Sequence, residues 1–297
     1  GKPTGAPNPD GTQAPKPDPF EDPSPDLLLT QFPQDNPAYT LVLNKFPVIP
    51  NHFILATKAF KSQTDVLEKE DLEAVYACVK AWGESDGNGG PSNGRKRLFA
   101  FFNSGDESGA SQPHRHLQFL PVESMRNDDC GSWEPLLDRC SEAQGVGSFG
   151  CRQLSQLPFV HFAAPIPPNP SAEMLHAMYL SLYREAVKAA KGYKEGSNGD
   201  SATGDDTGPS QGPAAISYNL GLTESTMIIC PRRNDSAQIP VSAVDNGNID
   251  DLGIVALNGT ILAGTLMVKA EAEWDELRNN QESLTNVLAT IGYPRSD

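Results

Sequence analysis

The sequence predicts an α+β fold in which a few helices flank a largely antiparallel sheet. Two observations carry this prediction: the chain holds short β-rich runs, of which we expect four to six to form strands, and most of these runs follow one another at hairpin-like spacings with few helical segments between them. At 297 residues the chain is long enough for one large core or two smaller ones. It is also long enough for an enzyme.

The candidate strands are short runs of β-branched and aromatic residues bounded by turn residues. Residues 39–44 and 52–57 are separated by Phe46-Pro-Val-Ile-Pro-Asn51, whose turn chemistry suits neighbouring antiparallel strands. The other candidate strands are residues 97–103, 114–122, 159–164, 217–221, 225–230 and 262–268.

Helices are predicted where apolar residues recur at three- and four-residue steps. From about Lys69 to Trp82 this stripe consists of Leu72, Val75, Tyr76, Val79 and Trp82. A second amphipathic helix opens at Pro170-Ser171 and runs to about Ala190, and a terminal helix spans about residues 271–288. The first of these helices should cover the sheet.

Two segments lack the apolar content needed for a packed element. Residues 1–37 are rich in Pro, Gly and Asp, which predicts a flexible surface arm, and residues 192–213 are low-complexity Gly, Ser and Asp, which predicts a disordered insertion. We therefore expect one catalytic domain over residues 38–297, with a C-terminal half that begins at about residue 155.

Composition and charge narrow the class of protein. A formal net charge of -15 with 38% apolar residues describes an acidic globular protein and argues against nonspecific binding to nucleic acid or to anionic membrane. A phosphate ligand must then meet a local basic pocket, and basic residues do flank the candidate strands: Lys45, Arg95, Lys96, Arg97, Arg115, Arg232, Arg233 and Lys269.

Compartment can be predicted from two further features. No apolar run approaches the roughly 20 residues that cross a bilayer, and the first residues lack the apolar core of a secretory signal. Five cysteines are an odd count with no C-x-x-C pair, which favours a reducing compartment. We expect a cytoplasmic or nuclear protein.

The residues that can carry chemistry cluster at the candidate strand from residue 114 to 122. Because side chains alternate along a strand, His114, His116 and Gln118 should share one face and converge within about 7 Å. Imidazole is nucleophilic near neutral pH, and its attack on phosphorus yields a phosphoramidate that a second nucleophile can cleave. The preceding loop, Asn103 to Gln112, adds glycines that allow close backbone approach and polar groups that hydrogen-bond phosphate.

Spacing by itself leaves other interpretations open. The histidines could be packed or exposed without a role, or an H-x-H pair could bind zinc with a third ligand from His161, His52 or Cys130.

The run Gly109-Ala-Ser-Gln-Pro-His-Arg-His-Leu-Gln118, with Asn103-Ser-Gly105 ahead of it, resembles the active-site signature of the histidine-triad superfamily in its H-x-H-x-Q transferase branch. More narrowly, the chain is similar to the fungal diadenosine tetraphosphate phosphorylases, also called ATP adenylyltransferases. Four stretches carry the narrower resemblance: residues 43–52, residues 217–223, Leu257-Asn-Gly-Thr260 and Lys269. The resemblance covers roughly residues 39–290 and implies a histidine-triad-like fold.

The resemblance implies a reaction and a role for each matched residue. His116 would attack the α-phosphate of diadenosine tetraphosphate, expel ATP and hold AMP until inorganic phosphate releases it as ADP. Gln118 would hydrogen-bond a nonbridging phosphoryl oxygen, and its neutral amide would favour transfer over hydrolysis because it cannot relay a proton. His114 would orient its neighbour or the loop. The implied substrate-binding residues are Lys2, Asn44, Lys45, Asn103, Gly109, Ala110, Ser111, Gln112, Asn258, Gly259, Thr260, Thr265 and Lys269.

The expected partners are the nucleotide and inorganic phosphate, with no nucleic acid and no membrane, and we expect a monomer. No metal ligand set and no required cofactor are implied, beyond a divalent cation that would accompany the polyphosphate. One departure is Glu224, which stands where the family members carry basic residues, and an acidic group near polyphosphate would be repelled unless Arg232 or Arg233 paired with it. The second interpretation, which base rates favour, is that Glu224 is solvated at a turn. Three rivals stay open: a nucleotide sensor without turnover, a zinc-dependent hydrolase, and a sugar-nucleotide transferase.

Overall fold

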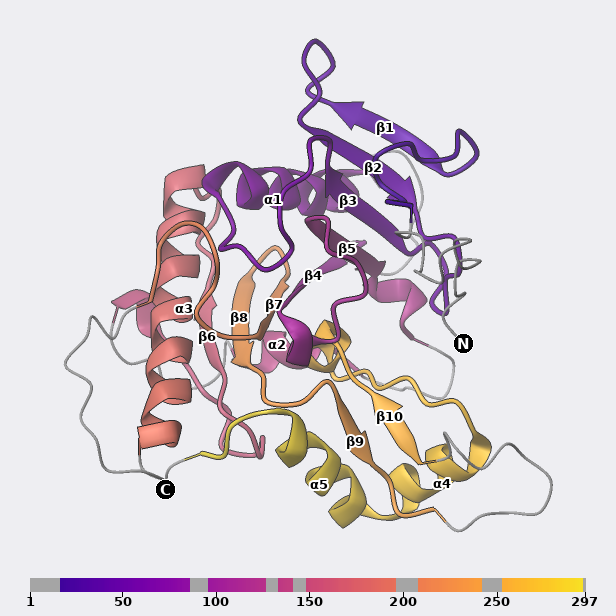
Figure 1. Ribbon diagram of the computed structural model, residues 1–297, viewed down its shortest axis with the longest axis vertical. Coiled ribbons are helices and arrows are strands. Elements are labelled where there is room, and N and C mark those ends of the chain that lie inside the picture. Colours follow the sequence, from indigo (N-terminus) through magenta and orange to yellow (C-terminus); the bar gives the residue numbers. More distant parts are fainter. Residues whose placement is uncertain are drawn as a thin grey trace, which may run out of the picture.

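The structure is a computed structural model that describes residues 17–85, 96–126, 133–140, 148–195, 208–241 and 253–295. Its centre is an eight-stranded sheet in the order β1-β2-β3-β5-β4-β7-β8-β6, in which every neighbouring pair is antiparallel (Figure 1). The strands are β1 (Leu28–Phe32), β2 (Tyr39–Leu43), β3 (Phe53–Thr57), β4 (Leu98–Ser104), β5 (His116–Pro121), β6 (Phe162–Pro165), β7 (Tyr218–Leu222) and β8 (Thr226–Pro231). The predicted α+β fold is confirmed.

A separate ribbon pairs β9 (Ser236–Gln238) with β10 (Ile254–Ala256). The helices are α1 (Lys69–Glu84), α2 (Leu136–Arg139), α3 (Ala172–Glu195), α4 (Glu271–Asn279) and α5 (Gln281–Ile291), and two of the short 3-10 helices lie near the candidate site, η1 (Asp106–Ser108) and η7 (Gly259–Ala263).

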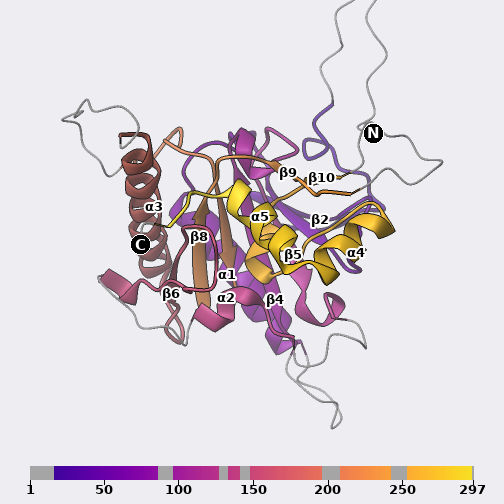
Figure 2. The ribbon, with the colours of Figure 1, turned by 90° about the horizontal axis from the view of Figure 1, so that it is seen from below.

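The sheet separates two apolar cores, because successive side chains on a strand point to opposite faces. On β4, Ala100 and Phe102 join the core beneath α1 and α3, whereas Phe99 and Phe101 join the core beneath η7, α2, α4 and α5. Figure 2 shows α3 to one side of the strands and α4 and α5 toward the other. The C-terminal segment therefore covers the face of the sheet that carries Phe101.

Several predicted elements differ from the structure. Residues 262–268 form no strand, because the Asn258 side chain accepts the Thr260 N–H and starts η7, which ends at Gly264 with a φ of 78°. The predicted terminal helix is two helices, since Asn280 leaves the helical conformation and its side chain caps α5 through the N–H groups of Glu282 and Ser283. In the sequence, an apolar run with no turn signal cannot be assigned to a strand rather than to a buried 3-10 turn.

The predicted flexible arm is wrong for its described second half. Residues 28–32 form β1, which pairs with β2, and residues 17–27 lead into it with Phe20 buried. Lys2 and the rest of residues 1–16 lie outside the described residues, as do residues 196–207 of the predicted insertion. At the insertion's C-terminal end, the Gly212 carbonyl accepts the N–H of Val66 at 2.8 Å. None of the described helices has the length and apolar character to cross a membrane.

Candidate active site

The candidate site is built on β5, at the face of the sheet that the C-terminal segment covers. His116 pairs with Ala56 of β3, and Gln118 lies between Ile54 of β3 and Phe101 of β4. His116 and Gln118 therefore share a face, as predicted, while Leu117 packs into the opposite core. His114 precedes the strand and bridges to Ser62.

The hydrogen bonds of His116 define which ring nitrogen can react. Its Nδ1 lies 2.8 Å from the carbonyl oxygen of His114, and because a carbonyl can only accept, Nδ1 carries the proton. In the neutral ring Nε2 then holds the free lone pair. Burial lowers the pKa of His116 to about 4, so the ring is neutral near pH 7. The geometry presents an unprotonated nucleophilic nitrogen.

Gln63 joins the histidine strand to the loop that follows β4. Its Oε1 accepts the His116 N–H at 2.8 Å, and its Nε2 donates to the carbonyls of Asn103 and His116 at 2.7 and 3.2 Å. Gln63 is buried, so this contact fixes the spacing between the two site segments. The sequence analysis missed Gln63, because a lone glutamine in a polar loop carries no periodic signal.

Gln118 is held by a second histidine. The amide of Asn44 donates to His52 Nδ1 at 2.9 Å, so the proton of His52 is on Nε2, which donates to Gln118 Oε1 at 3.0 Å. Burial lowers the pKa of His52, and the bond to Gln118 opposes that shift. With its oxygen occupied, the Gln118 NH2 group is the part free to donate among the described contacts. Among the described contacts, Asn44 is linked to Gln118 through His52.

His114 has partners that the sequence analysis missed, among them Asp18, Thr57 and Phe20. Its Nδ1 lies 2.6 Å from Asp18 Oδ2 and its Nε2 lies 3.0 Å from Thr57 Oγ1. The ring of Phe20 meets His114 edge-on at 5.7 Å between centroids and lies over His116 at 5.1 Å. Both Asp18 and Phe20 belong to residues 1–37, whose composition predicted a flexible arm.

The loop between β4 and β5 packs against the C-terminal segment. Asn103 Oδ1 accepts from Gly259 N and from Asn219 Nδ2, each at 2.9 Å, which leaves the Asn103 amide NH2 as its free donor. Gly109 has a φ of 76°, and a Cβ there would stand 2.6 Å from the Leu257 carbonyl oxygen. A side chain at that position would both strain the backbone and separate the two segments.

A buried guanidinium lies behind this loop. Arg232 is 2% exposed and donates to the Asn219 side chain, to the Leu257 carbonyl at 3.0 Å and to the Ile291 carbonyl. Burial lowers the pKa of Arg232 to about 10, which leaves it charged near pH 7. Among the described residues its partners are neutral acceptors, so the positive charge is available to the loop through Asn219, which also donates to the Ser108 carbonyl.

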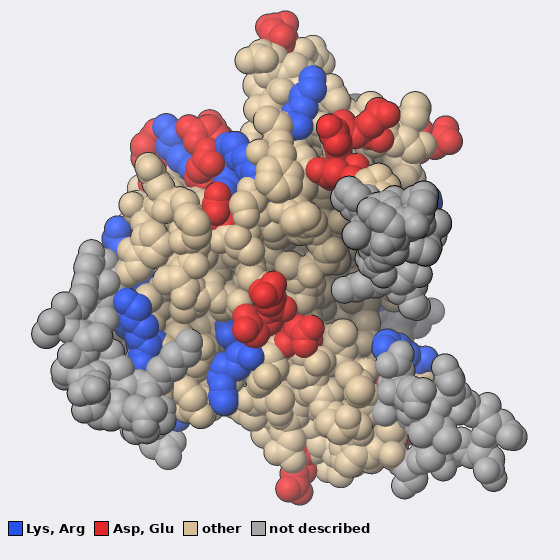
Figure 3. Space-filling model, viewed as in Figure 1, with Lys and Arg blue, Asp and Glu red and all other residues tan. Residues whose placement is uncertain are grey.

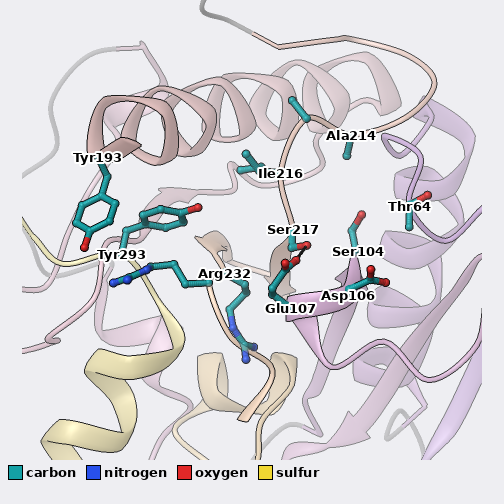
Figure 4. A pocket seen from close by; sticks show the side chains of 13 residues that line it. Thr64, Ser104, Asp106, Glu107, Tyr193, Ala214, Ile216, Ser217, Arg232 and Tyr293 are labelled. Atoms are coloured by element: carbon teal, nitrogen blue, oxygen red, sulfur yellow. Dashed lines mark hydrogen bonds between the residues drawn. The ribbon is translucent and has the colours of Figure 1, made fainter. Parts of the chain in front are cut away.

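Beside the same loop is a cavity of about 580 Å³, which Arg232 also lines (Figure 4). Asp106, Glu107 and Ser217 line one wall, and Glu107 accepts a hydrogen bond from Ser217. Arg233 packs against the rings of Tyr193 and Tyr293. Because Asp106 and Glu107 oppose the charges of Arg232 and Arg233, these four side chains offer polyphosphate no net positive charge.

The remaining residues predicted to bind substrate do not all lie beside the β4–β5 loop. Asn258 caps η7 beside the loop, and Thr260 lies in η7, where its Oγ1 donates to the Thr265 carbonyl at 3.0 Å. Lys45 is exposed, with Nζ 5.5 Å from the Phe46 ring centroid, and the described contact of exposed Lys269 is its N–H to Glu273. The loop continues toward β5 through Ala110, Ser111 and Gln112. The hydrogen bonds found among the described residues include none from the side chains of these three.

Two of the basic residues predicted to supply a phosphate pocket are engaged elsewhere. Arg115 is buried against Asp71 at 2.7 Å and Glu68 at 3.0 Å, and Arg97 pairs with Glu134 and Asp138. On the face drawn in Figure 3, Lys and Arg side chains stand in small separate groups. Arg95 lies outside the described residues.

Glu224 is a turn residue, as the second interpretation has it, so the clash with polyphosphate and the pairing with Arg232 or Arg233 do not arise. It occupies the β7–β8 turn with its carboxylate 4.0 Å from Lys80 Nζ, whereas Tyr218, at the far end of β7, pairs with Ser104. A position in a turn cannot be placed on a sheet edge until the strand register is known.

Of the residues considered as a third zinc ligand, His52 lies near His116, but its two ring nitrogens are engaged by Asn44 and Gln118. His161 binds the Leu154 N–H and the Phe159 carbonyl, and Cys130 lies outside the described residues. Within the described ranges no three His, Cys, Asp or Glu side chains form a metal-binding group.

Comparison with known proteins accounts for nearly the whole chain. The model of the Ap4A phosphorylase N-terminal domain matches residues 5–139, and that of the ATP adenylyltransferase C-terminal domain matches residues 155–294. Protein APA1 of Saccharomyces cerevisiae is 27% identical over 282 residues, which cover 90% of this chain and 74% of the yeast protein.

A second protein of the same yeast, diadenosine 5',5'''-P1,P4-tetraphosphate phosphorylase 2, is 24% identical over 279 residues, or 91% of this chain and 74% of its own length. The crystal structure of yeast Ap4A phosphorylase Apa2 matches with a TM-score of 0.72 at 25% identity, covering 95% of this chain and 83% of the other, and that enzyme has also been solved with Ap4A and with AMP. The chain belongs to the Ap4A phosphorylase/ATP adenylyltransferase family of nucleotidyltransferases.

Proposed function

We propose that this protein cleaves diadenosine tetraphosphate with inorganic phosphate to give ATP and ADP, through an AMP group held on His116. The observation that carries the proposal is the state of His116: Nδ1–H is tied to the His114 carbonyl and Nε2 is unprotonated near pH 7. A neutral imidazole with a fixed tautomer is a competent nucleophile toward phosphorus.

In the first half-reaction, the Nε2 lone pair attacks the α-phosphorus of the dinucleotide. The N–P bond forms as the P–O bond to the ATP group breaks, and the electron pair of that bond leaves with the ATP oxygen. A terminal phosphate oxygen is stable as an anion, so the leaving group needs no proton. The resulting imidazolium keeps its Nδ1–H on the His114 carbonyl.

In the second half-reaction, an oxygen of inorganic phosphate attacks the same phosphorus and the N–P bond breaks. ADP leaves and His116 returns to its neutral form with Nδ1 still protonated. Since no proton has to move at the phosphorus, an amide at position 118 suffices. The Gln118 NH2 group, oriented by His52, would donate to a nonbridging oxygen.

The polyphosphate would lie along the β4–β5 loop. The Asn103 amide and the buried charge of Arg232 behind Asn219 would supply the attraction that an acidic protein otherwise lacks. We further propose that the enzyme works as a monomer on nucleotides rather than nucleic acid, in the cytoplasm or nucleus. A divalent cation would enter with the polyphosphate and need no site built by the protein.

The test is a product assay with and without inorganic phosphate. ATP plus ADP, formed only with phosphate, supports phosphorolysis, whereas ATP plus AMP indicates hydrolysis. His116→Ala should lose turnover, and His176→Ala on α3, away from β5, is the matched control. Nucleotide binding without any product would support a sensor, and loss of activity with a chelator that zinc restores would support the zinc-dependent hydrolase.

A further inference from the structure

Residues 18–20 bring two side chains from the N-terminal segment onto the histidines. One carboxylate oxygen of Asp18 lies 2.6 Å from His114 Nδ1, and the other accepts the N–H of Phe20 at 2.9 Å. Phe20 is 6% exposed and packs with Val42 and Ala56 of β2 and β3. In Figure 1 the indigo start of the described chain lies on the same side of the molecule as these strands.

The carboxylate settles the protonation pattern of His114. A carboxylate accepts, so His114 carries its proton on Nδ1, and in the neutral ring Nε2 accepts from the Thr57 hydroxyl at 3.0 Å. Both ring nitrogens of His114 therefore have a hydrogen-bond partner. Because the carbonyl of this residue accepts the Nδ1–H of His116, the position of His114 sets the acceptor that orients the nucleophile.

We propose that Asp18 is a positioning residue for the nucleotidyl transfer: it holds His114, and through the His114 carbonyl it fixes the tautomer and direction of the His116 ring. This inference rests on the proposed function for its kinetic part only. The contact has the form of a carboxylate–histidine pair, which elsewhere fixes a tautomer and raises the basicity of the imidazole.

Charge adds to this role in the intermediate. When Nε2 of His116 takes up the phosphoryl group, the ring becomes a cation inside a buried site. The titratable groups that act on it are His114, Asp18 and His52, and of these Asp18 alone contributes a negative charge that favours the cation. The asparagine variant keeps an acceptor for His114 but removes that charge.

The competing explanation is that Asp18 only stabilises the fold. The burial of Phe20 allows the two roles of Asp18 to be tested separately. The segment is anchored by the burial of Phe20 between β2 and β3, so the fold does not depend on the Asp18 carboxylate, whose side chain is 24% exposed. Asp22, exposed on the same segment, is the matched control for a lost carboxylate.

The first measurement is nitrogen-15 NMR of histidine-labelled protein, which is tractable with five histidines in the chain. The wild type should show His114 protonated on Nδ1 with a strongly downfield proton, and Asp18→Asn should shift the signals of both His114 and His116. Asp22→Asn should leave them unchanged. Unchanged His116 signals in Asp18→Asn would overturn the proposal without any reference to activity.

The second measurement separates kcat from KM with diadenosine tetraphosphate and phosphate. Asp18→Asn should lower kcat at least about tenfold with KM within about twofold, because the negative charge that favours the His116 cation is lost while substrate binding is not. Asp18→Glu should recover part of the loss seen in Asp18→Ala. Wild-type kcat in Asp18→Asn, or a loss matched by an equal fall in thermal stability, contradicts the proposal. A wild-type protein without turnover refutes the proposed function and leaves the NMR result to decide on Asp18.

Discussion

The pH dependence of His116 gives a prediction whose size follows from the structure. Burial lowers its pKa from 6.5 to about 4, a difference of about 2.5 units that corresponds to about 3 kcal/mol between the protonated and neutral forms. At pH 5.5 a group with that pKa is only about 3% protonated. Activity that depends on the neutral ring should therefore persist well below the pH at which an ordinary histidine becomes charged.

The same shift predicts a loss of stability in acid. The unfolded chain binds a proton at His116 below about pH 6.5, while the folded protein does not bind it until about pH 4, so the free energy of unfolding falls as pH drops through this window. The slope is at most about 1.4 kcal/mol per pH unit for one histidine. His161 has a pKa lowered to about 4 by burial as well and adds a similar slope.

Urea denaturation of the wild type and of His116→Asn between pH 7 and pH 4.5 isolates the contribution of His116 to the pH dependence of the free energy of unfolding. An asparagine amide can donate to the His114 carbonyl as the imidazole does, but it does not titrate. The variant should show a shallower dependence on pH, by up to about 1.4 kcal/mol per unit, with the His161 contribution cancelling in the difference. Identical slopes for the two proteins, or an acid limb of kcat/KM for the wild type near pH 6.5, would refute the reasoning.

Three further outcomes follow from the geometry. Gly109→Ala should lower activity while costing about 1–2 kcal/mol, because the residue is left-handed and faces the Leu257 carbonyl; a kinetic and urea comparison showing neither effect would contradict this. Arg115→Met should cost about 3–5 kcal/mol by leaving Asp71 buried and unpaired, and adding Asp71→Asn should restore part of it in the same urea assay. Gln118→Ala should reduce kcat by about 100-fold through loss of an oriented donor, and a wild-type rate would exclude that role.

The sequence predicted seven of the eight strands of the central sheet and its main helices, and it missed β1. Short β-rich runs at residues 97–103 and 114–122 predicted β4 and β5, and the three- and four-residue steps from Lys69 predicted α1. The alternation of side chains along a strand put His116 and Gln118 on one face, because the two-residue period of a strand holds whatever its neighbours are.

The sequence pattern did not predict the contacts between distant segments. Asp18 meets His114 across 96 positions, and Asn103 meets Gly259 across 156. Neither pairing leaves a local signature, and the proline-rich composition around Asp18 favoured a mobile arm. Long-range polar contacts of this kind depend on the strand order, which local patterns do not define.

The covalent step on His116 is the central claim, and a trapped adduct tests it most directly. The protein is incubated with dinucleotide labelled in the α-phosphate and quenched in alkali, where a phosphoramidate survives, and the digest is read by mass spectrometry. We predict one AMP group on the peptide that contains His116, absent from His116→Ala and discharged as ADP by added phosphate. Turnover of the wild type with no adduct, together with full activity of His116→Ala, would contradict the mechanism.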